Sequence, residues 1–142
     1  MLGQSILLLA VAALCIAVRA ESKSAVLRYI GLLCIGISAV CGIAGVAALG
    51  RNLTPFPKPD AKARLTLCGI YGVIRHPLYV CVALGAIGWS LFQNSWAAVG
   101  ISLVLCVFLD AKARREERWL RQQFEDYAAY ERKVRRFIPG IY

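Results

Sequence analysis

The chain has 142 residues, of which 59% are hydrophobic, and its mean hydropathy is +0.62. A soluble domain of this size exposes much of its surface to water and needs more polar side chains than this. The composition therefore predicts an integral membrane protein. Lys and Arg number 17 against 8 Asp and Glu, a net charge of +9. In a chain held mostly in lipid, this excess indicates an anionic membrane surface as its partner and not nucleic acid.

Four apolar runs follow one another, at residues 5–18, 26–49, 78–92 and 96–109. With flanking residues we place the membrane spans at 3–19, 26–49, 77–93 and 95–111. The first span differs from a signal peptide because its basic residues follow the apolar run instead of preceding it. The fold class predicted is all-α: one domain over residues 1–142, built as an integral membrane bundle of four transmembrane helices.

Basic residues divide unequally between the two sides of this bundle. Fourteen of the 17 Lys and Arg fall in the 51–76 connection or after residue 109. By the positive-inside rule, both termini and the 51–76 loop are expected to be cytoplasmic. Neither Gly nor Pro occurs in the 38 residues between Gly100 and Pro139, where one helix would be about 57 Å long. We therefore expect the chain to bend beyond the fourth span, as a cytoplasmic C-terminal helical extension over the bundle mouth.

The second span carries small residues at spacings of three and four, which places them on one helix face. They are Gly31, Cys34, Ser38, Cys41, Gly45 and Ala48. Such a face lets another membrane helix approach closely. The partner helix is either internal or from a second copy, so a homodimer is an open possibility. Packing on this face explains two of the six cysteines. The sequence has no CxxC pair and a single His, so it lacks the ligand spacing of a metal site.

Chemistry is expected at the cytoplasmic ends of the helices. Within the apolar runs Arg28 is the one charged side chain, and no Asp, Glu or His is present, which argues against a small proton-coupled transporter. Arg75 and His76 precede Pro77, a residue suited to the first position of a helix. They would then stand at a helix N-terminus, where free amides and the helix dipole favour an anion. Alternatively, both side chains are interfacial and reach lipid phosphates.

A second charged cluster, Glu116 and Glu117, lies beyond the fourth span. We expect Glu116 to face the site. Glu117 lies about 100° further round the helix, so we expect it to point away and to pair with Arg121 four residues later. The same spacing joins Lys112 to Glu116. The alternative is that both acids are ordinary solvated helix charges.

Five stretches taken together resemble the isoprenylcysteine carboxyl methyltransferase family, which is itself similar to the phospholipid methyltransferases. They are LGRNLTPFP, LTLCGIY, RHPLY, EERWL and FEDYAAYERKVRRFIPGIY, within residues 49–142. The resemblance implies a membrane methyltransferase that uses S-adenosylmethionine. The cofactor would be enclosed between residues 50–79 and 110–142.

The resemblance also implies the roles of individual residues. The cofactor would be lined by Leu65, Thr66, Tyr71, His76, Pro77, Leu78, Tyr79 and Glu116. Catalysis would depend on Arg75, His76 and Glu116, and Lys112 would face the substrate.

The implied acceptor is a lipophilic molecule that enters from the bilayer, with carboxyl methylation of the isoprenylcysteine type as the expected reaction. A carboxylate acceptor needs no general base, whereas an amine usually does, and the sequence offers no dedicated base. The alternatives are an amino-phospholipid N-methyltransferase and a non-enzymatic four-helix membrane protein, such as a small transporter or scaffold.

Overall fold

The computed structural model describes residues 2–17, 24–50 and 67–142. Its elements are α1 (Leu2–Ala17), α2 (Ala25–Leu49), the 3₁₀ turn η2 (Gly69–Gly72), α3 (Pro77–Phe92), α4 (Trp96–Gln123) and α5 (Tyr127–Lys133). The β pairing in the described ranges is an isolated parallel bridge between Ile74 and Arg135. The predicted all-α class is therefore confirmed.

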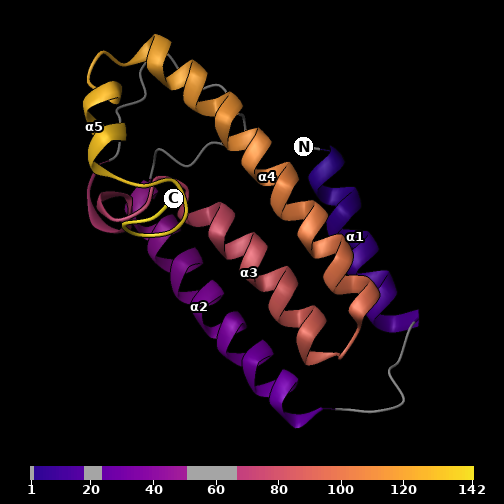
Figure 1. Ribbon diagram of the computed structural model, residues 1–142. Coiled ribbons are helices and arrows are strands. Elements are labelled where there is room, and N and C mark those ends of the chain that lie inside the picture. Colours follow the sequence, from indigo (N-terminus) through magenta and orange to yellow (C-terminus); the bar gives the residue numbers. More distant parts are fainter. Residues whose placement is uncertain (1, 18–23, 51–66) are drawn as a thin grey trace.

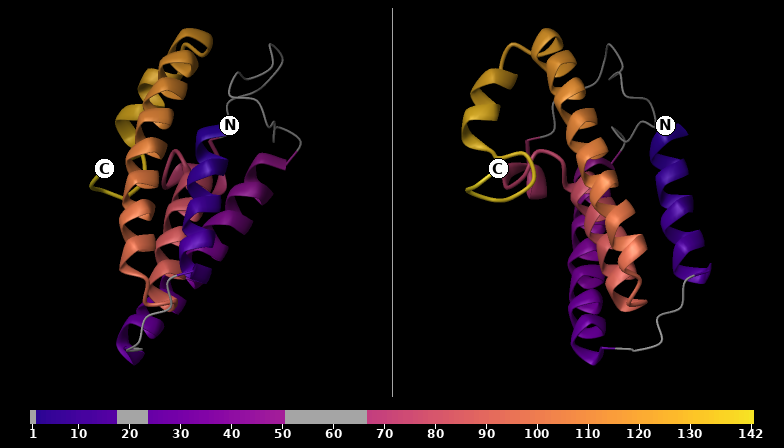
Figure 2. Two further views of the ribbon diagram at one scale, coloured as in Figure 1. Left: turned by 90° about the vertical axis from the view of Figure 1, so that its right-hand side faces the viewer. Right: turned by 45° about the vertical axis from the view of Figure 1, so that its right-hand side comes forward.

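Helices α1 to α4 lie side by side and alternate in direction, in the order α2, α3, α4, α1 across Figure 1. Helix α1 packs against α4, and the right-hand view of Figure 2 shows it on the side of α4 away from α2. A tight turn joins α3 to α4, with Asn94 at a φ of 54°. The alternation brings the start of α1, the start of α3 and the far half of α4 to the same end of the bundle.

Two of the helices, α2 with 25 residues and α4 with 28, are long and apolar enough to cross a membrane. Helices α1 and α3 have 16 residues each, slightly fewer than the roughly 17 that a crossing needs. The outward faces of the bundle are apolar, since Leu9, Ile43 and Val107 are each at least 70% exposed. Exposed apolar surface on this scale is typical of a face that meets lipid or another protein.

The small face of α2 packs directly against α3. A Cβ atom added to Gly31 would lie 2.6 Å from the carbonyl oxygen of Gly88, so the two backbones touch at this point. Two turns further along the same face, the Ser38 hydroxyl donates a 2.8 Å hydrogen bond to the carbonyl of Cys81. The predicted close approach is confirmed, and the partner helix is α3 of the same chain.

The chain bends after α4, as expected beyond the fourth span. Phe124 ends the helix in an extended conformation, and α5 then turns back towards the bundle (Figure 1). Tyr127, Tyr130 and Val134 bury their side chains together on the inner side of this turn. Their burial fixes the segment after α5 beside the start of α3, where the charged residues gather.

Candidate active site

The start of α3 is shaped by the segment that follows α5. His76 caps the helix and Pro77 is in its first turn, as the sequence predicts. The amide of Arg75 donates to the carbonyl of Arg135 at 2.8 Å, and the amide of His76 donates to Arg136 at 3.1 Å. The amide of His76, at the cap of the helix, is therefore bonded to the returning chain and is not free to bind an anion.

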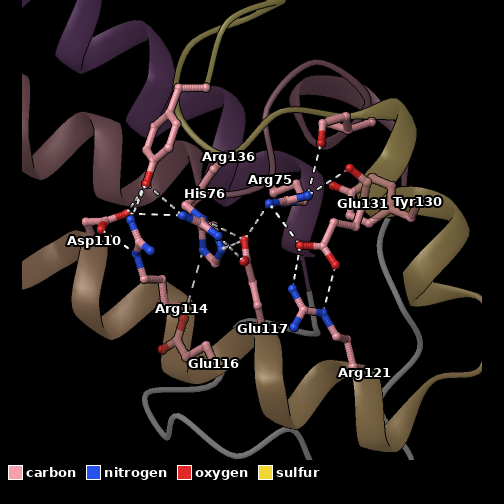
Figure 3. Close-up of polar contacts among 12 residues, drawn as sticks. Arg75, His76, Asp110, Arg114, Glu116, Glu117, Arg121, Tyr130, Glu131 and Arg136 are labelled. Atoms are coloured by element: carbon pink, nitrogen blue, oxygen red, sulfur yellow. Dashed lines mark hydrogen bonds and ion pairs between the residues drawn. The ribbon is translucent and has the colours of Figure 1, made fainter.

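Glu117 is the acid at the centre of the charged cluster, with a side chain that is 1% exposed. Its Oε1 forms an ion pair with Arg75 at 2.9 Å and a 3.1 Å hydrogen bond with Nε2 of His76 (Figure 3). Arg136 donates to both carboxylate oxygens, at 3.0 and 2.6 Å. The prediction that Glu117 points away and pairs with Arg121 is wrong. Arg121 instead donates two hydrogen bonds, of 2.7 and 2.6 Å, to Glu131.

The charge state of Glu117 follows from these contacts. Glu117 lies in the polar half of α4, beyond the apolar run that ends at Leu109. Burial alone would raise its pKa, but hydrogen bonds from His76 and Arg136 and the charge of Arg75 outweigh burial and lower the pKa to about 2. The hydrogen bond to Glu117 also raises the pKa of Arg136. At neutral pH the cluster therefore holds one carboxylate between two guanidinium groups.

The guanidinium of Arg75 is buried and bonded to other residues of the chain. Its Nη1 donates to the carbonyls of Glu131 and Val134 at 3.0 and 3.2 Å, at the end of α5, while Nη2 pairs with Glu117. Its Nε is buried and has no hydrogen-bond partner among the described residues. The predicted catalytic residue Arg75 thus lies in the cluster, where it ties α5 to α4.

Glu116 faces a different group of residues from its neighbour. Its Oε1 accepts a 2.5 Å hydrogen bond from the Tyr79 hydroxyl, and its Oε2 lies 4.0 Å from Nδ1 of His76. The rings of His76 and Tyr79 are stacked, with centroids 5.2 Å apart and planes within 7°. Lys112 does not pair with Glu116; it donates to Gln4 of α1 at 3.1 Å and lies 4.9 Å from the centre of the Tyr79 ring.

Tyr71 is linked to α5 through its main chain, where its carbonyl accepts a 2.6 Å hydrogen bond from the Tyr130 hydroxyl. Burial, together with the charges of Tyr130 and Glu116, raises the pKa of Tyr71 to about 12. The structure therefore brings Tyr71, His76, Tyr79 and Glu116 to one end of the bundle, as predicted.

The other predicted cofactor residues are placed differently. Pro77 and Leu78 lie against Gly45 of α2, because a Cβ added there would be 3.5 and 2.9 Å from their side chains. These two residues therefore help to seat the start of α3 on α2. Leu65 and Thr66 lie outside the described residues.

A further cluster that the sequence did not reveal holds the end of the chain. The hydroxyl of Tyr142 donates to Asp110 at 2.9 Å and accepts from Arg114 and Arg136, at 2.7 and 2.9 Å. The ring of Phe137, in the same segment, lies 5.9 Å from the ring of His76. This segment therefore borders the candidate site.

One sequence signal does distinguish Glu117 from Glu116. The buried residues of α4 recur at steps of three and four and end at Glu117; they are Ala98, Ser102, Leu105, Leu109, Ala113 and Glu117. Because these positions form one stripe on a helix, extending the apolar stripe beyond the membrane span leads to Glu117. The adjacent acid lies off the stripe and keeps a partly exposed side chain.

Comparison with known proteins gives a family match over most of the chain. The pattern of the family described as phospholipid methyltransferase matches residues 26–127. A probable protein-S-isoprenylcysteine O-methyltransferase of rice, Oryza sativa, is 31% identical over 117 residues, covering 80% of this chain and 61% of the relative.

Two bacterial relatives match a shorter region of the chain and are named as metal resistance proteins. The cobalt-zinc-cadmium resistance protein CzcN of Cupriavidus metallidurans is 36% identical over 78 residues, covering 54% of this chain and 36% of the relative. The nickel-cobalt-cadmium resistance protein NccN of Alcaligenes xylosoxydans is 31% identical over 78 residues, covering 54% of this chain and 37% of the relative. The chain thus spans between 36% and 61% of the length of these curated relatives.

Proposed function

The chain belongs to the phospholipid methyltransferase family, and on that premise we propose that it is an S-adenosylmethionine-dependent methyltransferase that acts on a lipophilic acceptor in a membrane. Members of the family are integral membrane proteins and generally use this cofactor. The observation that carries the proposal is the convergence of two stretches 37 to 41 residues apart, which bring His76 and Tyr79 to Glu116 and Glu117.

The side chains at this convergence fit the charge of the cofactor. When bound, it supplies a methyl group on a positively charged sulfonium and carries an ammonium and a carboxylate at its amino-acid end. Glu116 is the acid of the cluster that has no arginine partner among the described residues. Its carboxylate can accept hydrogen bonds from an ammonium or from ribose hydroxyls. The stacked rings of His76 and Tyr79 form a flat aromatic surface beside Glu116.

Methyl transfer from the sulfonium requires mainly that the two reactants are held in line. Alignment of a nucleophile with a methyl donor can account for about 7–11 kcal/mol of the barrier. Groups that hold the two reactants in line are therefore the main requirement. The charged cluster around Glu117 supports this role, because it joins α3, α4 and the segment after α5 at one point.

Two acceptors are proposed. The first is a carboxylate of the isoprenylcysteine type, supported by the rice relative and by Lys112, a cation beside Tyr79 that can attract a carboxylate. The second is an amino-phospholipid, supported by Glu116, whose carboxylate attracts an ammonium and lies 4.0 Å from His76.

We also propose how the chain lies in the membrane. Both termini and the 51–76 connection would face the cytoplasm, from which the cofactor enters, and the acceptor would enter sideways from the bilayer. The support is the 14 of 17 basic residues on that side and the alternating bundle, which brings the starts of α1 and α3 to the same end (Figure 1).

Calorimetric titration of S-adenosylmethionine into the detergent-purified protein tests the function. We expect binding, and we expect Glu116→Gln to weaken it about ten- to a hundredfold, because one hydrogen bond between charged partners is lost. Glu125→Gln, at an exposed acid after α4, is the matched control and should bind as the wild type does. If S-adenosylmethionine does not bind to the folded wild-type protein, the proposed function is wrong and the non-enzymatic membrane protein is the alternative that stands.

The acceptor is identified by a separate experiment. The protein is incubated with methyl-labelled cofactor and total membrane lipid. Label released by mild base indicates a methyl ester, whereas base-stable label indicates an N-methyl group.

A further inference from the structure

We propose that Glu117 is a positioning residue that holds His76 with its ring proton on Nε2, so that Nδ1 is free to take a proton from the methyl acceptor. The inference rests on the proposed methyltransferase function and adds to it a general base, which the sequence did not reveal. Glu117 itself does not touch the reactants, because it is buried behind His76 and acts through the imidazole ring.

The position of the ring proton follows from the hydrogen bond between the two side chains. Nε2 of His76 lies 3.1 Å from Oε1 of Glu117, within hydrogen-bonding distance. An ionised carboxylate accepts hydrogen bonds and has no proton to donate. The hydrogen in this contact therefore belongs to Nε2. In a neutral imidazole the other nitrogen, Nδ1, then carries a lone pair.

Charged groups of both signs surround the imidazole ring. The titratable groups that face it or lie beside its partners are Arg75 on its own segment, Tyr71 on η2, Tyr79 on α3, Lys112, Glu116 and Glu117 on α4, and Arg136 after α5. Glu117 lies on the Nε2 side of the ring between Arg75 and Arg136, and Glu116 lies on the Nδ1 side.

Nδ1 is the ring nitrogen on the side of Glu116, away from the contact with Glu117. It makes no hydrogen bond to the described residues, and Oε2 of Glu116 lies 4.0 Å from it. The rings of Tyr79 and Phe137 flank the imidazole, with centroids 5.2 and 5.9 Å away, and the His76 side chain is 9% exposed. The ring is thus held on several sides while one nitrogen remains available, and Glu116 stabilises the charge that a captured proton creates.

The proton transfer can be written in full for an acceptor that carries a proton on its reacting atom, such as an ammonium. Nδ1 takes that proton, and the electron pair left on the acceptor atom forms the new bond to the methyl carbon. The bond from that carbon to the sulfonium sulfur breaks, and its electron pair stays on sulfur. His76 then loses the proton to water. A carboxylate acceptor brings no such proton and would leave Nδ1 unused.

Nitrogen NMR of the imidazole tests the inference without any turnover. His76 is the single histidine of the chain, so protein labelled with ¹⁵N-histidine gives one pair of ring resonances. In spectra recorded at a pH where the ring is neutral, we expect the proton on Nε2 and the lone pair on Nδ1. A neutral ring protonated on Nδ1 would overturn the proposal.

Two matched substitutions separate positioning from general stability. Glu117→Ala removes the oxygen that accepts from Nε2, so the neutral ring should no longer be held with its proton on Nε2, and resonances of the form protonated on Nδ1 should appear. The initial rate of methyl transfer should fall at least tenfold while the dissociation constant for S-adenosylmethionine stays within about threefold. Glu131→Ala is the control, since Glu131 also pairs with Arg75, at 3.5 Å, but belongs to α5 and lacks a contact with His76. It should leave the ring spectrum unchanged.

The outcomes distinguish this inference from the proposed function. If Glu117→Ala does not fold, the spectrum of the wild-type protein still decides the tautomer. A wrong tautomer in a protein that binds the cofactor overturns the inference alone. A protein that shows the expected tautomer and binds no cofactor overturns the proposed function, and with it the need for a base. A ring that keeps its proton on Nε2 alone in folded Glu117→Ala shows that Glu117 does not position the ring.

Discussion

The two ends of α3 are held to their neighbours by opposite means. In its apolar half, near Gly88, α3 meets α2 through backbone atoms brought together by small residues, and shape alone sets the contact. At its polar start, Arg75 and His76 meet Glu117 of α4 in an ion-pair cluster closed by Arg136. The apolar contact tolerates no added atoms, whereas the polar contact tolerates no lost charge. Different substitutions should therefore break them.

The largest effect is expected from Glu117→Ala at the polar end. Removing one partner of a buried ion pair costs about 3–5 kcal/mol, because the remaining charges stay buried without compensation. Here Arg75 and Arg136, with side chains 7% and 12% exposed, would be left facing each other. The free energy of unfolding in detergent, measured beside Glu125→Ala at an exposed position, tests this. If the two variants are equally stable, the cluster does not hold this end of the molecule.

Acid should weaken the same end, by about 3 kcal/mol at most. The pKa of Glu117 is lowered from 4.5 to about 2 in the folded chain, and each unit corresponds to about 1.4 kcal/mol. Because the folded pKa lies below the unfolded one, this stabilisation is complete above about pH 4.5 and is lost as the pH falls towards about 2. Unfolding measured across this range should show a smaller acid loss in Glu117→Gln. Equal losses in both proteins would assign the effect to other acids.

In the apolar half, a single methyl group should be enough to disturb the contact. A Cβ on Gly31 would lie 2.6 Å from both the Gly88 carbonyl oxygen and the Phe92 amide nitrogen, so Gly31→Ala should destabilise the protein by about 1–3 kcal/mol. Gly36→Ala is the control on the same helix, since nothing lies within 4 Å of its added Cβ. It should be neutral or slightly stabilising, as alanine favours helix. If both variants behave alike, α2 and α3 are not in such close contact.

The same contrast explains which parts of the structure could be predicted from the sequence. Helix ranges, the small face of α2 and the helix start at Pro77 depend on residues a few positions apart, and the periodicity of one helix contains that information. The predicted span at 77–93 and the observed α3, Pro77–Phe92, differ by one residue. Which helix would cover the small face was not predictable, because that depends on how the helices are arranged.

At the polar end, local reasoning gave the wrong partners. The spacing of four residues favoured Glu117 with Arg121, yet each finds a partner from another segment: Glu117 meets Arg136 and His76, and Arg121 meets Glu131. An exposed pair four apart on a helix contributes only about 0.3–0.5 kcal/mol. Burial in a cluster of several charges outweighs so small a preference, and burial depends on where α5 folds back.

The smallest effect is expected at Tyr142, whose contacts at the polar end are open to water. Its hydroxyl contacts Asp110, Arg114 and Arg136 at 2.7 to 2.9 Å, but the residue is 43% exposed, so water can replace these partners. Tyr142→Phe should therefore cost about 0.5–1.5 kcal/mol of unfolding free energy. Tyr29→Phe, at an exposed tyrosine of α2, is the control for the loss of a hydroxyl and should leave stability unchanged. A cost for Tyr142→Phe as large as that of Glu117→Ala would show that the end of the chain, and not the buried carboxylate, holds the charged cluster together.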